Sequence, residues 1–258
     1  MFELGLKLFS TNDYYVNEAK RLYEEGHYDY IELYSVPDSY NDFVNIWKKL
    51  DIPFIIHAPH FGGGLNLSKK ECLNNNLKLV KEAKKFADEL DSEFIIFHGG
   101  IGGNMEETAK QLKSFNEHRA LIENKPYKVF PKLANDEACV GYNFCEINYI
   151  INVTGCGFCL DFGHVACSAN SQGKDIYYYF EEFLNLKPKM FHLTDIKDIT
   201  SEYDSHPHLG EGEFNIKKIL SMLSLNDKIT IETIKNSKAN LNDFMKDIKF
   251  LREVYETK

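Results

Sequence analysis

The chain has 258 residues, enough for one large α/β domain, and 43% of them are hydrophobic against 27% charged, as in ordinary globular proteins. The formal net charge of −9 argues against a broad basic surface, although divalent cations would reverse the local sign in a carboxylate-rich cleft. No apolar run reaches the roughly 18 residues that span a membrane, and no secretory signal pattern opens the sequence. We therefore expect a cytoplasmic protein with no membrane partner.

Strand-like and helix-like patterns alternate along the whole chain. Short, nearly continuous apolar runs predict buried strands at residues 2–9, 28–33, 52–57, 93–98, 118–123, 156–161, 189–193 and 228–232. Helical spacing of apolar residues predicts helices at residues 13–25, 39–50, 68–90, 104–116, 136–151, 176–186, 216–225 and 241–255, with Ser68 and Glu71 as a capping box. Residues 126–135 and 194–213 are expected to be irregular.

Eight strand–helix units with short returns predict a closed (β/α)₈ TIM barrel of the α/β class, and this length is typical of one. The alternative is an open, doubly wound sheet. We favour the barrel because no glycine-rich phosphate loop follows the first strand. The sequence contains no linker or low-complexity tract, so residues 1–258 are expected to form one domain.

Ionisable residues gather at the ends of the last six predicted strands, whereas the first two strands offer none. In such a barrel the carboxyl ends of the strands form one rim, where active sites lie. Imidazoles and carboxylates without matching cations are above all metal ligands. The candidates are His57, His60, His98, Glu123, Asp161, His164, His192, Asp195, Asp204, His206 and Glu232. Of these, His60 and Asp195 are also explained simply as loop and turn residues.

The segments around these residues resemble the endonuclease IV branch, or AP endonuclease family 2, of the xylose-isomerase-like TIM barrels. The most specific piece is the stretch from Asp204 to Gly212, DSHPHLGEG. The others, in the same order along the chain as in the family, are HAPH at 57–60, FHGG at 97–100, LIEN at 121–124, LDFGH at 160–164, FHLTD at 191–195 and IET at 231–233.

The resemblance implies a cluster of three zinc ions and a DNA-repair hydrolase. One zinc would be held by His57, His98 and Glu123, a second by Glu123, Asp161, His192 and Glu232, and a third by His164, Asp204 and His206. The implied reaction is hydrolysis of the phosphodiester 5′ to an abasic site in DNA by a metal-bound hydroxide, which leaves a 3′-hydroxyl. No protein partner is implied.

The chain departs from this family in two loops. Where the family has a double glycine and an arginine that grip DNA, this sequence has Ser10–Asp13, and His60 stands in the place of a wedging tyrosine. His60 and Phe61 are therefore the candidate substrate-binding residues, with Phe61 able to stack between bases. Lys125-Pro126 also follows Glu123-Asn124 in place of the family's link to the next strand.

Two other functions are compatible with the sequence. A sugar or sugar-phosphate isomerase or epimerase would use one Mn²⁺ or Mg²⁺, with Glu123 and Glu232 as the catalytic pair that moves a proton between adjacent carbons. Its substrate would be a small keto sugar, and the extra histidines would bind hydroxyl groups. The third possibility is a metal-binding barrel without catalysis.

Overall fold

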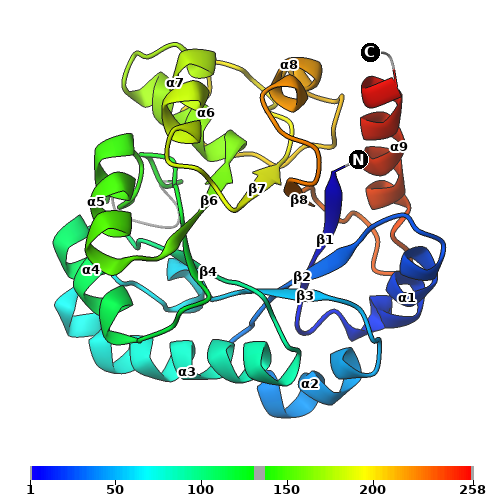
Figure 1. The fold of residues 1–258 in the computed structure, drawn as a ribbon, viewed down its shortest axis with the longest axis horizontal. Coiled ribbons are helices and arrows are strands. Elements are labelled where there is room, and N and C mark those ends of the chain that lie inside the picture. Colours follow the sequence, from blue (N-terminus) through cyan, green and yellow to red (C-terminus); the bar gives the residue numbers. More distant parts are fainter. Residues whose placement is uncertain (1, 131–136, 257–258) are drawn as a thin grey trace.

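Eight parallel strands close into a barrel in the computed structural model, which describes residues 2–130 and 137–256 (Figure 1). Each strand pairs with the next in chain order, and β8 returns to β1. The strands are β1 (Glu3–Phe9), β2 (Tyr30–Tyr34), β3 (Phe54–His57), β4 (Ile95–His98), β5 (Ala120–Glu123), β6 (Gly157–Asp161), β7 (Met190–Leu193) and β8 (Lys228–Ile231). The predicted (β/α)₈ barrel is confirmed.

Helices follow the strands and surround the barrel in Figure 1. The α-helices are α1 (Val16–Glu24), α2 (Tyr40–Lys48), α3 (Leu73–Glu89), α4 (Met105–Ser114), α5 (Phe144–Thr154), α6 (Phe162–Ser171), α7 (Ile176–Leu184), α8 (Ile216–Ser221) and α9 (Asn242–Glu256). Short 3₁₀ segments lie at η1 (Asp13–Tyr15), η2 (Phe61–Gly63) and η3 (Lys70–Cys72). Within the described residues, none of these helices has the length and apolarity to cross a membrane.

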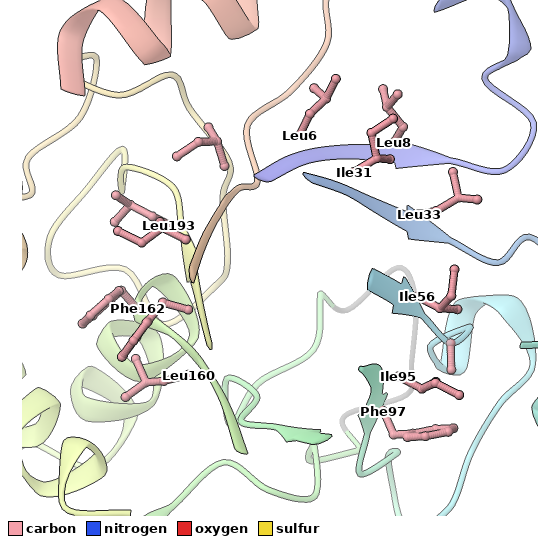
Figure 2. Close-up of a cluster of buried hydrophobic side chains, with 14 of the residues drawn as sticks. Leu6, Leu8, Ile31, Leu33, Ile56, Ile95, Phe97, Leu160, Phe162 and Leu193 are labelled. Carbon is pink, nitrogen blue, oxygen red and sulfur yellow. The ribbon is translucent and has the colours of Figure 1, made fainter. Parts of the chain in front are cut away.

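Alternation along the strands creates the main core between barrel and helices. Successive strand side chains point to opposite faces, so every second residue meets the surrounding helices. Leu6, Leu33 and Phe97 are fully buried in this way, and Figure 2 shows them pointing away from the barrel axis. This layer positions the strands, and with them the residues of the opposite face.

The intervening strand residues fill the barrel in two layers. The lower layer is a separate apolar cluster of Tyr30, Ile55, Ile96, Leu121, Cys159 and Met190. A Cβ on Gly5 would lie 2.4 Å from the Tyr30 ring, so only glycine leaves room for that ring. Two residues further along each strand, the same face carries Lys7, Glu32, His57, His98, Glu123, Asp161 and His192. We call this set the upper layer.

Three local predictions differ from the structure. No helix is predicted between residues 161 and 176, but Phe162–Ser171 forms α6; Asp161 caps it, and its Oδ1 accepts a hydrogen bond from the His164 amide (2.8 Å). Ser68 does not cap α3, which begins at Leu73; its hydroxyl instead donates to the carbonyl of Ile101 (2.9 Å). The helix expected at 136–151 begins only at Phe144, and its predicted first residue, 136, lies outside the described residues.

The long loop after β7 is fixed by one buried carboxylate. Asp195 accepts hydrogen bonds from the backbone amides of Gly210 (2.9 Å), Gly212 (3.1 Å) and Phe214 (2.9 Å). The side chain is fully buried, so these bonds replace its contacts with water. Asp195 therefore anchors the loop that contains Asp204 and His206.

Candidate metal centre

The upper layer brings candidate residues from neighbouring strands into register at the carboxyl rim. His98 pairs with Glu123 across β4 and β5, and Asp161 pairs with His192 across β6 and β7. Glu232 immediately follows β8 on the same rim. The closure of the barrel thus gathers residues that are far apart in sequence around one space.

A first group of donors meets at the Glu123 carboxylate. His57 Nε2 lies 3.1 Å and His98 Nε2 3.0 Å from Glu123 Oε2, and all three side chains are buried. The Nδ1–H of His57 donates to the carbonyl of Ala58 (2.7 Å). This bond fixes the tautomer that leaves Nε2 free to bind a metal ion.

A second group meets at His192. Its Nδ1 lies 3.3 Å from Glu232 Oε2, 3.5 Å from Glu123 Oε2 and 3.8 Å from Asp161 Oδ2. The Nε2–H of His192 donates to Glu32 Oε2 (2.8 Å), so Nδ1 is the nitrogen that would bind a metal ion in exchange for its proton. Glu123 contacts both groups and is the one carboxylate that they share.

A third group lies at the first turn of α6 and the loop after β7. Asp204 Oδ2 is 3.1 Å from His164 Nε2 and 2.8 Å from His206 Nε2. The ammonium of Lys125 lies against the same histidine, with Nζ 3.0 Å from His164 Nε2. All nine residues that the sequence resemblance assigns to metal ions are therefore close together, but a lysine has joined the third set.

Two residues of the centre were missed because the first two strands were expected to contribute none. That expectation is wrong. Lys7 on β1 forms ion pairs with Glu32 on β2 and with Glu232 Oε1 (2.7 Å). Glu32 is fully buried and accepts a hydrogen bond from the Thr230 hydroxyl (2.6 Å). In the sequence, Lys7 stands between two leucines, and Glu32 stands between an isoleucine and a leucine. A charged residue in the middle of an apolar strand, rather than at its end, was the signal for both.

Burial and charge shift the pKa values of these groups in opposite directions. Burial lowers the pKa of His98 well below its ordinary value, so its imidazole is neutral at pH 7. Burial acts to raise the pKa of Glu123, but His98 and Lys125 outweigh it and hold the pKa well below its usual range. Neutral imidazole and ionised carboxylate are the forms that bind metals. Burial raises the pKa of Asp161 to about 6, which marks a carboxylate short of positive neighbours.

The predicted substrate-binding residues line the space above the centre. His60 precedes η2, its ring lies parallel to that of His98 at 5.9 Å, and Phe61 begins η2. A cavity of about 350 Å³ opens here, bordered by the aromatic rings of Phe9, Phe61 and Phe130 and floored by the centre. Phe9 and Phe130 are about half exposed and so present ring surface to this cavity.

The donor set fits divalent metal ions. Among the described residues, buried Asp161 Oδ2 and His192 Nδ1 of the second group have no hydrogen-bond partner. Buried polar atoms are almost always satisfied, so this pair marks a place where an ion would complete the contacts. His57, His98 and Glu123 offer donors within 4.8 Å of one another, as do Glu123, Asp161 and His164. Imidazole with carboxylate is the ligand chemistry of zinc.

Fold and site together define a TIM barrel with an imidazole–carboxylate cluster on its carboxyl rim. The chain belongs to the xylose isomerase-like TIM barrel family, whose model matches residues 20–254. This confirms the resemblance found in the sequence.

Individual relatives agree with this assignment. The chain is 27% identical over 217 residues to "Probable endonuclease 4" of Halothermothrix orenii, a match that covers 75% of this chain and 76% of the relative. Among solved structures, endonuclease IV from Thermus thermophilus superposes with a TM-score of 0.75 at 18% identity, covering 99% of this chain and 100% of that one. A D-tagatose 3-epimerase-like protein gives 0.71 at 18% identity, covering 99% and 98%. These two structural likenesses show the fold alone.

Proposed function

We propose that this protein is a divalent-metal-dependent phosphodiesterase of the endonuclease IV type, which hydrolyses DNA on the 5′ side of an abasic site. The observation that carries the proposal is the Glu123 carboxylate shared by two donor groups on the barrel rim. A carboxylate between two donor sets suits paired ions, the arrangement used for in-line displacement at phosphorus. The relatives named endonuclease 4 support this reaction over others on the same fold.

Zinc is the proposed metal. His57, His98 and Glu123 would hold one ion, and Glu123, Asp161, His192 and Glu232 a second. When bound, such ions activate water and neutralise charge on the phosphodiester. His164, Asp204 and His206 form the adjoining wall of the centre, beside Lys125.

The surrounding residues hold these ligands in place. Lys7 orients Glu232 from below, and Glu32 fixes the tautomer of His192 through its 2.8 Å contact. Glu32 is fully buried and the Lys7 side chain is only 11% exposed, so their charges act at low dielectric and with little motion. Above the centre, His60 and Phe61 would contact the nucleotide at the abasic site, where a missing base leaves a gap for an aromatic ring.

A sugar isomerase or epimerase is the second candidate. Glu123 and Glu232 both approach His192 Nδ1, at 3.5 and 3.3 Å, and so flank one space as a proton-transferring pair would. The cavity of about 350 Å³ has room for a small sugar, and Mn²⁺ or Mg²⁺ would suit the carboxylates. The structural likeness to an epimerase-like protein agrees with the fold that this reaction uses.

A substrate panel distinguishes these candidates. Zinc-loaded protein is incubated with a 5′-labelled duplex that contains one abasic site, with the matched intact duplex, and with a set of ketoses. We expect cleavage of the abasic duplex alone, with a 3′-hydroxyl that a DNA polymerase extends. Ketose conversion without cleavage would establish the isomerase instead, and inactivity on both with zinc bound would leave a non-catalytic metal-binding barrel.

A further inference from the structure

We propose that the ammonium group of Lys125 takes the place of a third metal ion, so that the centre binds two zinc ions and one resident lysine. This inference rests on the proposed function, from which it takes the two-ion centre. It departs from the three ions that the sequence resemblance implies, and it assigns Lys125 a role as a built-in cation.

Lys125 is held firmly inside the centre. It lies two residues after Glu123, its side chain is only 11% exposed, and its backbone amide donates to the carbonyl of Gly141 (3.0 Å). Nζ lies 3.0 Å from His164 Nε2 and 3.6 Å from Glu123 Oε1. Pro126 follows and restricts the backbone of Lys125 to extended conformations.

The lysine and a third ion would compete for one place. The Nδ1–H of His164 donates to the carbonyl of Asn124 (3.0 Å), so Nε2 is the nitrogen of this ring that a metal ion could reach. Nε2 lies 3.1 Å from Asp204 Oδ2, and the Lys125 ammonium lies against the same ring, 3.0 Å from Nε2 and 3.4 Å from Nδ1. An ion bound to Nε2 would therefore lie close to a buried positive charge. Without His164, a third ion would keep only the Asp204 and His206 donors.

The charges in the centre also favour two ions. Five carboxylates and two lysines surround it, namely Glu32, Glu123, Asp161, Asp204, Glu232, Lys7 and Lys125. Two divalent ions leave this set close to neutral, whereas a third adds two positive charges beside an ammonium. Repulsion between buried charges is weakly screened by solvent and salt, so the third ion is strongly disfavoured.

Zinc stoichiometry tests the inference without an activity measurement. Purified protein is loaded with excess ZnCl₂, passed through a desalting column, and its zinc-to-protein ratio is measured by plasma mass spectrometry. We expect two zinc ions per chain in the wild type and three in Lys125→Met, in which a neutral thioether replaces the ammonium beside His164. Lys125→Gln is the second neutral variant, and circular dichroism verifies that both variants fold.

Matched variants test whether the number of bound zinc ions depends on the charge of Lys125. Lys125→Arg keeps the charge and is expected to stay at two ions, as is Lys128→Met, which removes a lysine of the same loop that pairs with Glu202 rather than with His164. The double variant Lys125→Met/His206→Ala should return from three ions to two. Three ions in the wild type, or two in both neutral variants, would overturn the inference alone. A wild-type chain that binds no zinc would instead overturn the proposed function on which the inference rests.

Discussion

The two layers inside the barrel lie two residues apart on each strand, yet they differ completely in chemistry. The lower layer is apolar and sealed, with Tyr30 and Met190 among its buried members. The upper layer is almost entirely ionisable, and its charges are matched by one another and by neighbouring rim residues such as Lys125 and Glu232. Along each strand, the residue that stabilises the barrel therefore comes first and the residue that forms the site follows two positions later. This agrees with the general behaviour of the fold.

Substitution of Glu123 should produce the largest effect, since this residue joins both donor groups of the upper layer. We expect Glu123→Gln to lower cleavage of an abasic duplex about 10³-fold or more, because a neutral amide neither bridges ions nor balances their charge. Initial rates on the labelled duplex and zinc content measure it. Glu106→Gln, an exposed change on α4, is the control. Wild-type rates in the Glu123 variant would remove the shared carboxylate from the mechanism.

A cavity in the lower layer should destabilise the protein without affecting metal binding. We expect Met190→Ala to reduce the free energy of unfolding by about 2–5 kcal/mol, as is usual for a buried methionine, while the zinc content stays unchanged. Urea unfolding measures the loss. Leu225→Ala removes a side chain that is 59% exposed and serves as the control. Loss of zinc in folded Met190→Ala would show that the layers are not separate.

Metal binding should stabilise the upper layer in turn. Each bound zinc ion, at 100 times its dissociation constant, adds about 2.7 kcal/mol to the free energy of unfolding. For a chain of this size that corresponds to a rise in melting temperature of roughly 5–10 °C. Thermal unfolding with zinc or with a chelator measures this difference, and Glu123→Gln should show little of it. An equal melting temperature in both conditions would contradict the proposed centre.

The smallest expected effect is a pH dependence at the edge of the upper layer. Burial and the neighbouring Lys125 lower the pKa of His60 from 6.5 to about 4. Between these values the unfolded chain binds the proton more readily, so stability falls as the pH drops from 6.5 towards 4. Allowing for partial exposure, we expect a loss of about 1–2 kcal/mol.

Urea unfolding of the wild type and of His60→Gln across this pH range isolates the contribution of His60. The variant should lose less stability on acidification than the wild type. His118→Gln, at a side chain that is 90% exposed, is expected to follow the wild type. Identical profiles for wild type and His60→Gln would show that His60 does not titrate in this way.

The sequence was sufficient to predict the barrel and the residues on its rim, because both follow from local patterns. Apolar runs mark the strands, and His57, His98 and Asp161 end theirs. Lys7 and Glu32 could not be found in the same way. Their meeting depends on the register Lys7↔Glu32 and on the closure of β8 against β1, which no local pattern specifies.

Helix α6 and the role of Lys125 could not be predicted from the sequence, for similar reasons. Residues 162–171 begin with Phe-Gly and contain small polar residues, so they look like a turn, whereas tertiary contacts bury nearly the whole helix. Lys125 was visible only as a departure from the family. Its position against His164 depends on the path of the chain after β5, which the sequence alone does not determine.

The Asp195 carboxylate has a consequence for how the rim tolerates change. Since it accepts hydrogen bonds from the backbone at 210, 212 and 214, the returning half of the loop is fixed close behind His206. The outgoing half is fixed separately, because the Asn170 side chain donates to the carbonyls of Ile199 (2.8 Å) and Ser201 (2.7 Å). A single extra residue between His206 and Gly210 would move the imidazole out of register, so the length of this short segment should be strictly limited.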